Sequence, residues 1–259
     1  MNFKPIKDLT NKRILISNDD GIGQKGIVLL EKILHQFTDD VWVVAPSGER
    51  SCAGHSKKNN SNYEQELKKI SDKHYSVEGT PSDCIRAALK YVLTDKRPDM
   101  IVTGINNGRN IAEDITYSGT IGAAIEGTLR GIPSVAVSQC TDGAEPVNWS
   151  YHEQYLPKIL QNLVKGSFSV DTLISINFPN VETDKFKGIA VCRHGGRRFL
   201  SGTLENSRLN TASMETGFHE QTYKYPEDHL KIDDHITISA LKVDMNDEIG
   251  LEMLSSIIK

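Results

Sequence analysis

Two adjacent carboxylates follow a short apolar run near the start of the chain. The run Ile14–Ser17 has the composition of a buried strand, and it ends in Asn18, Asp19, Asp20 and Gly21. In open α/β sheets, ligands collect outside the carboxyl ends of the strands, and oxygen donors there suit Mg²⁺ or Mn²⁺. The same residues also form ordinary turns, so the segment alone leaves a divalent-metal site and a plain turn as alternatives.

A glycine pattern overlaps the acids and indicates different chemistry. Residues 21–26 read Gly-Ile-Gly-Gln-Lys-Gly, which matches the G-x-G-x-x-G fingerprint of dinucleotide-binding proteins between a strand and a helix. Two observations count against a nicotinamide-dependent oxidoreductase. Asp19 and Asp20 would place negative charge beside the pyrophosphate, and residues 45–47 lack the acid that binds a ribose.

Polar residues also follow the apolar run 100–103, in the segment 104–108 that reads Gly-Ile-Asn-Asn-Gly. We expect them at the same sheet edge as the acids, within a loop that continues to residue 117. The carbonyl oxygen of Asn106 is a suitable ligand for a cation, and an Asn-Gly turn is the alternative.

Small polar residues precede the helical segment 121–129. Ser118, Gly119 and Thr120 combine hydroxyls with backbone N–H groups at a helix start, where phosphate binds readily. An ordinary N-cap is the alternative. Ser51, in a long polar loop over 47–61, is a candidate metal or phosphate contact. No G-x-S-x-G elbow or Walker P-loop occurs in the chain.

The elements that must position these residues alternate along the chain. Apolar runs typical of strands alternate with segments of helical periodicity, which predicts a mainly parallel sheet covered by helices on both faces. The expected strands are residues 14–17, 41–45, 74–78, 100–103, 134–138, 173–177 and 235–243, and the expected helices are 26–37, 82–93, 121–129, 153–164 and 251–258. We expect a Rossmann-like αβα core over residues 1–192 and a C-terminal extension over 193–259.

Composition limits the function further. Lys and Arg total 30 against 34 Asp and Glu, for a net charge of −4, which argues against binding of extended nucleic acid. The four cysteines show no zinc or disulfide spacing, so we expect reduced and mostly buried thiols. No apolar run approaches the length of a membrane span. We therefore expect a soluble, cytoplasmic protein, and any anionic substrate should be small.

Taken together, these segments resemble the survival protein E (SurE) family. The resemblance covers most of residues 13–192, in order. The matching segments are 14–21, 26–27, 43–46, 49–51, 54–56, 79–84, 99–110, 117–120 and 126–127, with weaker matches at 176–179 and 237–239. The chain departs from the family pattern at Ser47, where an acid is usual, and its segment 200–232 is shorter and less aromatic.

The resemblance implies a function and a site. It implies a metal-dependent phosphomonoesterase that hydrolyses nucleoside 5′-monophosphates, with 3′-monophosphates as a further substrate class, and a homodimer or homotetramer assembled through the extension. One divalent ion, Mg²⁺ or Mn²⁺, is expected in each subunit, where it would neutralise phosphate charge and activate water. Asp19 and Asp20 are the expected catalytic residues, Asp19, Asp20, Ser51 and Asn106 the metal ligands, and Asn107, Asn110, Ser118, Gly119 and Thr120 the substrate contacts.

A non-catalytic nucleotide- or anion-binding protein could use the same loops, and metal-dependent phosphate release separates it from an enzyme. The oxidoreductase alternative instead predicts nicotinamide binding without metal and indifference to substitution of Asp19.

Overall fold

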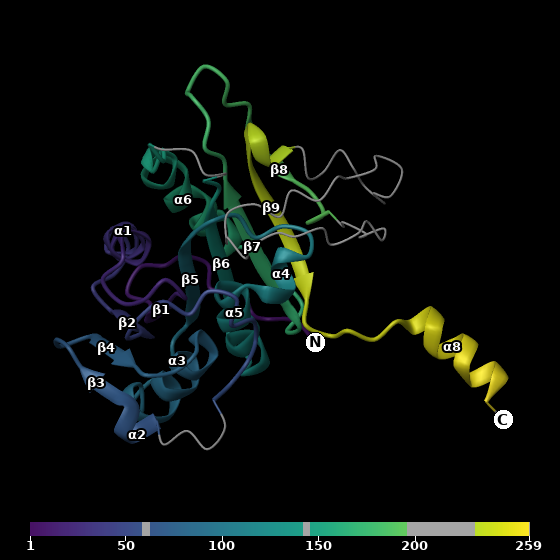
Figure 1. The fold of residues 1–259 in the computed structure, drawn as a ribbon, viewed down its shortest axis with the longest axis horizontal. Helices are drawn as coiled ribbons and strands as arrows, with labels where there is room; N and C mark the ends of the chain where they lie inside the picture. The colour runs from purple at the N-terminus through teal and green to yellow at the C-terminus, as the bar shows by residue number, and fades with distance from the viewer. Residues whose placement is uncertain (59–62, 142–145, 196–230, 259) are drawn as a thin grey trace, which may run out of the picture.

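The computed structural model describes residues 1–58, 63–141, 146–195 and 231–258. The described strands form one sheet, in the order β3-β4-β2-β1-β5-β6-β7-β9-β8 (Figure 1). The strands are β1 (Ile14–Ser17), β2 (Val41–Pro46), β3 (Leu67–Lys69), β4 (His74–Val77), β5 (Met100–Asn107), β6 (Ser134–Gln139), β7 (Thr172–Phe178), β8 (Gly188–Val191) and β9 (His235–Lys242). Most neighbours pair in parallel, and β3 with β4 and β7 with β9 pair antiparallel.

Helices cover both faces of this sheet. They are α1 (Lys25–Leu34), α2 (Tyr63–Glu66), α3 (Pro81–Ala87), α4 (Asp114–Tyr117), α5 (Gly119–Leu129), α6 (Ser150–Leu163) and α8 (Glu248–Ile257), with the π-helical turn η1 (Ala88–Val92) and the 3₁₀ turn η3 (Lys231–Asp233). Helices α1 and α6 pack together on one face, and α3 and α5 pack together on the other (Figure 1). The three-layer αβα architecture is confirmed.

The alternation of side chains along β1 explains the two layers of core. Ile14 and Ile16 pack on the face covered by α1 and α6, in a cluster that includes Leu30 and Leu160. Leu15 points to the opposite face, in a cluster with residues of α3 and α5. Strands buried on both faces read as continuous apolar runs, which is why the sequence identified them.

The strand order of the sheet reverses at β1. Strand β2 lies on one side of β1 and β5 lies on the other, both parallel to it. Adjacent helices that leave from the ends of such strands diverge to opposite faces, which opens a crevice at the carboxyl edge. The segments after β1 and at the end of β5 therefore meet at this crevice.

Several expected elements differ in the structure. The expected strand 100–103 continues to Asn107, so the loop expected from residue 104 is wrong over its first four positions. The expected helix 82–93 begins at Pro81 and changes to the π-helical turn η1. The sequence analysis predicted none of α2, β3, α4 and β8, and the thiol of Cys52 is exposed rather than buried.

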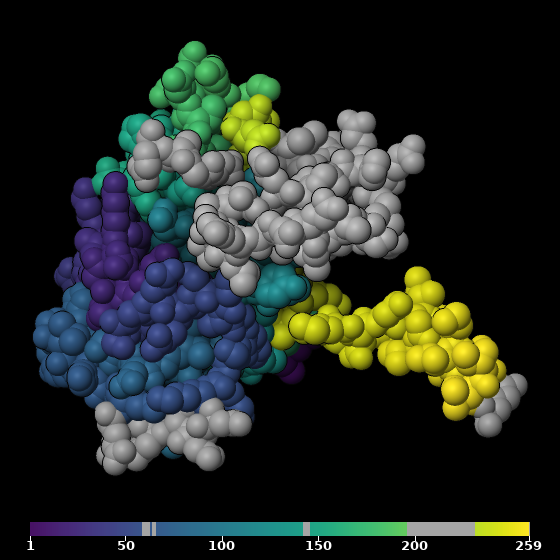
Figure 2. Space-filling view, in the orientation of Figure 1, coloured from purple at the N-terminus to yellow at the C-terminus, as the bar shows by residue number. Residues whose placement is uncertain are grey.

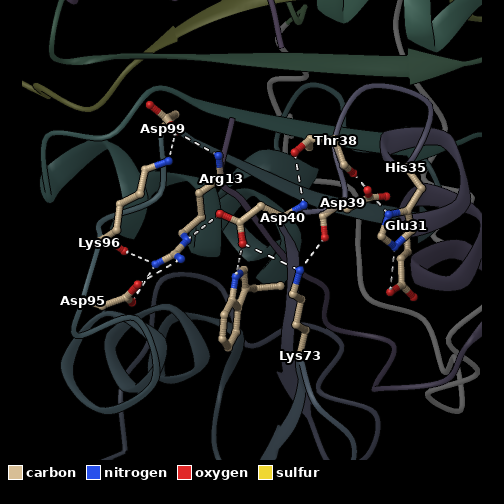
Figure 3. A network of polar contacts seen from close by, with 11 residues as sticks. Arg13, Glu31, His35, Thr38, Asp39, Asp40, Lys73, Asp95, Lys96 and Asp99 are labelled. Carbon is tan, nitrogen blue, oxygen red and sulfur yellow. Dashed lines mark hydrogen bonds and ion pairs between the residues drawn. The ribbon is translucent and has the colours of Figure 1, made fainter. Parts of the chain in front are cut away.

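A network of charged side chains joins the amino-terminal ends of β1, β2 and β5 (Figure 3). Arg13, directly before β1, contacts the Asp40 carboxylate at 2.9 Å and the Asp95 carboxylate at 2.7 Å. Its backbone N–H donates to Asp99, which precedes β5. Hydrogen bonds and ion pairs with Arg13 outweigh burial and lower the pKa of Asp40.

The C-terminal part of the chain contains one strand of the sheet and one helix that lies apart from it. Strand β9 lies between β7 and β8, whereas α8 stands away from the body of the chain (Figure 2). Helix α8 has no buried residue, and Ile249, Met253 and Ile257 are exposed on it. Within the described ranges, no helix combines the length and apolar character needed to cross a bilayer.

Candidate active site

A tight turn directs the two acids that follow β1. The Asn18 amide donates to the Gly21 carbonyl at 2.9 Å, and the Asn18 side-chain oxygen accepts from the Gly21 N–H at 3.3 Å. Gly21 has φ of +110°, a conformation that other residues rarely adopt. The chain turns directly after Asp19 and Asp20, so a plain turn and a cation site do not exclude one another.

The carboxylate of Asp19 is held by the N-terminus of α5. One oxygen accepts the Gly119 N–H at 3.1 Å, and the other accepts the Thr120 hydroxyl at 2.6 Å. A Cβ on Gly119 would lie 2.8 Å from the Asp19 Cβ, so only glycine permits this approach. The positive end of the helix dipole also favours a carboxylate here.

Asp20 points toward the end of β5. One of its carboxylate oxygens accepts the Asn107 N–H at 3.3 Å. Burial, with repulsion from Asp19 and Glu49, raises the pKa of Asp20 to about 6, and burial also raises the pKa of Asp19 despite its hydrogen bonds. The crevice therefore concentrates negative charge that a cation would stabilise.

The neutral candidate ligands lie on neighbouring segments. Asn106 donates its side-chain N–H to the Gly108 carbonyl at 2.8 Å, which leaves its amide oxygen as the donor atom for a cation. Ser51 is exposed and donates its hydroxyl to Glu49 at 2.9 Å. In this arrangement the Ser51 oxygen retains lone pairs for a metal.

The donor set fits a hard divalent cation. Two carboxylates, an amide oxygen and a hydroxyl are the oxygen ligands that Mg²⁺ and Mn²⁺ prefer. The described part of the chain contains no group of three or more His, Cys, Asp or Glu side chains placed to hold a metal. At this site, two of the four candidate donors, Ser51 and Asn106, are neutral oxygens.

A cleft of about 440 Å³ opens beside Asp20. It is lined by Asp20, Gln24, Lys25, Gly26, Glu49, Asn107, Pro146, Val147 and Trp149. Helix α1 begins at this cleft, and its N-cap residue Gln24 makes no side-chain capping bond. Backbone N–H groups at such a helix end favour an anion.

The expected substrate contacts lie in different parts of the site. Asn107 lines the cleft. Gly119 and Thr120 direct their donors at Asp19, and the Ser118 hydroxyl caps α5 by accepting the Ile121 N–H. For Ser118, the N-cap alternative therefore describes the geometry.

Asn110 is buried and hydrogen-bonded to the neighbouring strands. Its amide donates to the Ser138 hydroxyl at 2.7 Å, and its backbone N–H donates to the Asn177 side chain at 2.8 Å. These bonds join the segment after β5 to β6 and β7. In this conformation Asn110 supports the architecture of the edge.

The loop that carries Ser51 is fastened to α5. The Gly54 N–H donates to the Tyr117 carbonyl at 2.8 Å, and His55 contacts Glu126 at 3.0 Å. Burial opposes ionisation of Glu126, but contacts from His55 and Arg130 outweigh it and lower the pKa of this carboxyl. The contact of His55 with Glu126 thus helps to hold the loop against α5.

Among the cleft residues to which the sequence analysis assigned no role are Lys25, Glu49 and Trp149. Glu49 belongs to the matching segment 49–51, contacts Ser51 and raises the pKa of Asp20 by its charge. Trp149 lies directly before α6 and belongs to no motif. Only its apolar ring within a polar stretch could have drawn attention to it.

Known proteins are similar to this chain in sequence and in fold. A family model described as survival protein SurE matches residues 14–201. A protein named 5′-nucleotidase SurE from Paramagnetospirillum magneticum is 43% identical over 205 residues, which cover 79% of this chain and 78% of that protein. One of the same name from Bradyrhizobium sp. is 34% identical and covers 95% of this chain and 99% of its own length. The crystal structure of a SurE protein from Aquifex aeolicus has a TM-score of 0.78 and 30% identity, covering 95% of this chain and 100% of that one.

Proposed function

Because this chain belongs to the survival protein SurE family, we propose that its paired carboxylates bind one divalent metal ion for phosphate-ester hydrolysis. The chain is a 5′-nucleotidase, a metal-dependent phosphoric monoester hydrolase that acts on nucleoside monophosphates. We assign the ion as Mg²⁺ or Mn²⁺, with the ligands Asp19, Asp20, Ser51 and Asn106. The observation that carries the assignment is the acid pair at the switch point of the sheet, with Asp19 buried and Asp20 half-buried.

Each part of the site has a distinct role in this proposal. The bound ion supplies charge neutralisation of the phosphate and lowers the pKa of a bound water. Asp19 is fixed by α5 and provides an oriented ligand. Asp20 is the better proton acceptor, because it lines the open cleft and one of its oxygens has no bond to Asn107.

We place the substrate phosphate between Asn107 and the start of α1. The uncapped helix end and the Lys25 ammonium offer positive potential there, opposite the acids. Binding contacts from Asn110, Ser118, Gly119 and Thr120 stay predictions. Gly119 and Thr120 can act on the substrate indirectly, by orienting Asp19.

The test is phosphate release from nucleoside 5′- and 3′-monophosphates with Mn²⁺, with Mg²⁺ and with EDTA. Asp19→Asn should lower kcat/KM on the order of a hundredfold or more, because even outer-shell changes at metal sites cost about 10–100-fold. Asp72→Asn is the matched control, since Asp72 is exposed in a distant surface turn. The control should retain wild-type turnover.

Two results would contradict the proposal. Turnover that survives EDTA would show that the reaction does not need the metal. Wild-type turnover in Asp19→Asn would show that it does not need the acid pair. Metal-dependent nucleotide binding without phosphate release would instead support the binding-protein alternative. The comparisons do not favour that alternative or the oxidoreductase.

We also propose a homo-oligomer, a homodimer or homotetramer, as the working form. The exposed apolar side chains of α8, on a helix that stands away from the body, support this proposal (Figure 2). A cytoplasmic location stays a prediction.

A further inference from the structure

One wall of the cleft beside Asp20 is apolar. Trp149, Val147 and Pro146 lie on this wall, and Asp20 and Asn107 lie on the polar part. A small-molecule site commonly combines an apolar surface with a few placed polar groups. A nucleotide has the same division, with a charged phosphate at one end and an aromatic base at the other.

The indole of Trp149 is supported from behind. Its ring lies 5.5 Å from the His152 ring, between centroids, and the His152 ring stacks on Phe178 at 3.9 Å. His152 is fully buried, and Phe178 ends β7 within the core. This series of rings fixes the orientation of Trp149, so a ligand that stacks on it does not have to order the side chain.

A cation lies on the same indole. The Lys25 ammonium is 5.2 Å from the centroid of the Trp149 ring, and Lys25 is an exposed residue at the start of α1. A cation–π contact at an exposed site is weak, so a flat ligand can replace it. The released ammonium stays at the cleft, where it can approach the phosphate.

We propose that Trp149 stacks on the nucleobase of the bound nucleotide and sets the preference of the enzyme for nucleotides over base-free sugar phosphates. The inference rests on the proposed function, because the acid site must hold the phosphate end. Stacking accepts every base, since each has a π-face. Purines should bind more tightly than pyrimidines, because their larger rings cover more of the indole.

The first test compares AMP with ribose 5-phosphate, which shares the phosphate and sugar but lacks the base. The KM for AMP and the inhibition constant of ribose 5-phosphate against AMP hydrolysis are measured for Trp149→Ala and Trp149→Phe. Trp149→Ala should raise KM for AMP about tenfold relative to the ribose 5-phosphate constant, since base stacking is worth that order of affinity. Trp149→Phe should recover most of the loss.

The second test reads the stacked ring directly and does not depend on turnover. The chain has two tryptophans, Trp42 and Trp149. AMP should quench the fluorescence of the Trp42→Phe variant, in which Trp149 is the remaining indole, and should leave that of Trp149→Phe unchanged. Trp42 belongs to the charged network at the opposite edge of the sheet, so it is the matched control.

Equal weakening of AMP and ribose 5-phosphate in a folded Trp149→Ala, or quenching that persists in Trp149→Phe, would overturn the inference. Thermal melting separates folded from unfolded variants, and Trp149→Phe keeps the test valid if the alanine variant is unstable. Failure of the proposed function has a different signature. In that case Asp19→Asn would keep its activity, and AMP could still quench Trp149.

Discussion

The two ends of β1 carry charged side chains that differ in whether opposite charges pair with them. At the amino end, Arg13 is paired with Asp40 and Asp95, and these contacts lower the pKa of Asp40 although burial opposes them. At the carboxyl end, Asp19 and Asp20 lie side by side, and burial raises the pKa of each. Lys73 and Lys96 complete the amino-end cluster by pairing with Asp40 and Asp99, so its three cations match its three carboxylates. The same strand thus joins a neutralised cluster to a cluster that is negative.

This difference separates a structural role from a functional one. A cluster whose charges are matched has no further need of a ligand, and its main effect is to hold β1, β2 and β5 in register (Figure 3). A buried carboxylate pair costs folding free energy unless a cation is bound. The comparison therefore predicts that substitutions at the two ends change stability in opposite directions.

The largest effect on stability is expected at the balanced end. Arg13→Met should lower the free energy of unfolding by about 3 kcal/mol, because it leaves the partly buried Asp40 without its main cationic partner. Urea denaturation measures the change. Lys69→Met is the matched control, because the Lys69–Asp72 pair is exposed and should contribute less than about 0.5 kcal/mol.

The folded fraction of Arg13→Met should keep its kcat/KM, because the network is at the far end of the strand from the acids. A loss of specific activity as large as that of Asp19→Asn would break the comparison between the two ends.

The next effect concerns His152, a buried base near the carboxyl edge. Burial lowers the pKa of His152 to about 3, whereas an unfolded histidine titrates near 6.5. Below pH 6.5 the unfolded chain binds the proton and the folded chain does not, so stability present above pH 6.5 is lost as the pH falls. Between pH 7 and pH 5 the contribution should fall by about 2 kcal/mol.

The measurement is the difference in unfolding free energy between wild type and His152→Phe across this pH range. The phenylalanine ring keeps the stack with Phe178 but cannot take a proton. The variant should therefore gain on wild type as the pH falls. Parallel pH profiles would show that His152 is solvated or paired in solution.

The sequence predicted the framework well where burial alone determines structure. The apolar runs of β1, β2 and β6 have both faces covered, so hydrophobicity is enough to identify them. The end of β5 was missed because Gly104, Asn106 and Asn107 have the composition of a turn. Pairing with Ser138 and Gln139 of β6 decides the structure of that segment, and such pairing is not visible locally.

The site was predictable in its chemistry and less so in its contacts. Adjacent acids after a strand indicate a cation site by type and position. Which acceptor reaches the N-terminus of α5 depends on how helix and strand pack, and there the structure favours Asp19 over a direct approach by phosphate. The position of Trp149 depends on α6 and β7, which are distant in sequence from Asp20.

The smallest effect, and the one of opposite sign, is expected from Asp20→Asn in metal-free protein. The Asp20 pKa is about 6 when folded, against about 3.9 for an unfolded aspartate, so the folded chain binds more protons between pH 4 and 6. The contribution of Asp20 to stability is therefore present below pH 4 and lost as the pH rises through 6. At pH 7.5 in EDTA, Asp20→Asn should raise the free energy of unfolding by about 1–2 kcal/mol.

Added Mn²⁺ should make wild type more stable than Asp20→Asn. It should stabilise wild type in proportion to the logarithm of its concentration above Kd, and it should have little effect on Asp20→Asn. Urea denaturation with Mn²⁺ and with EDTA gives both results. If Asp20→Asn instead destabilises the metal-free protein, as Arg13→Met is expected to do, the carboxyl end of β1 is balanced by groups of the chain itself and does not need a cation.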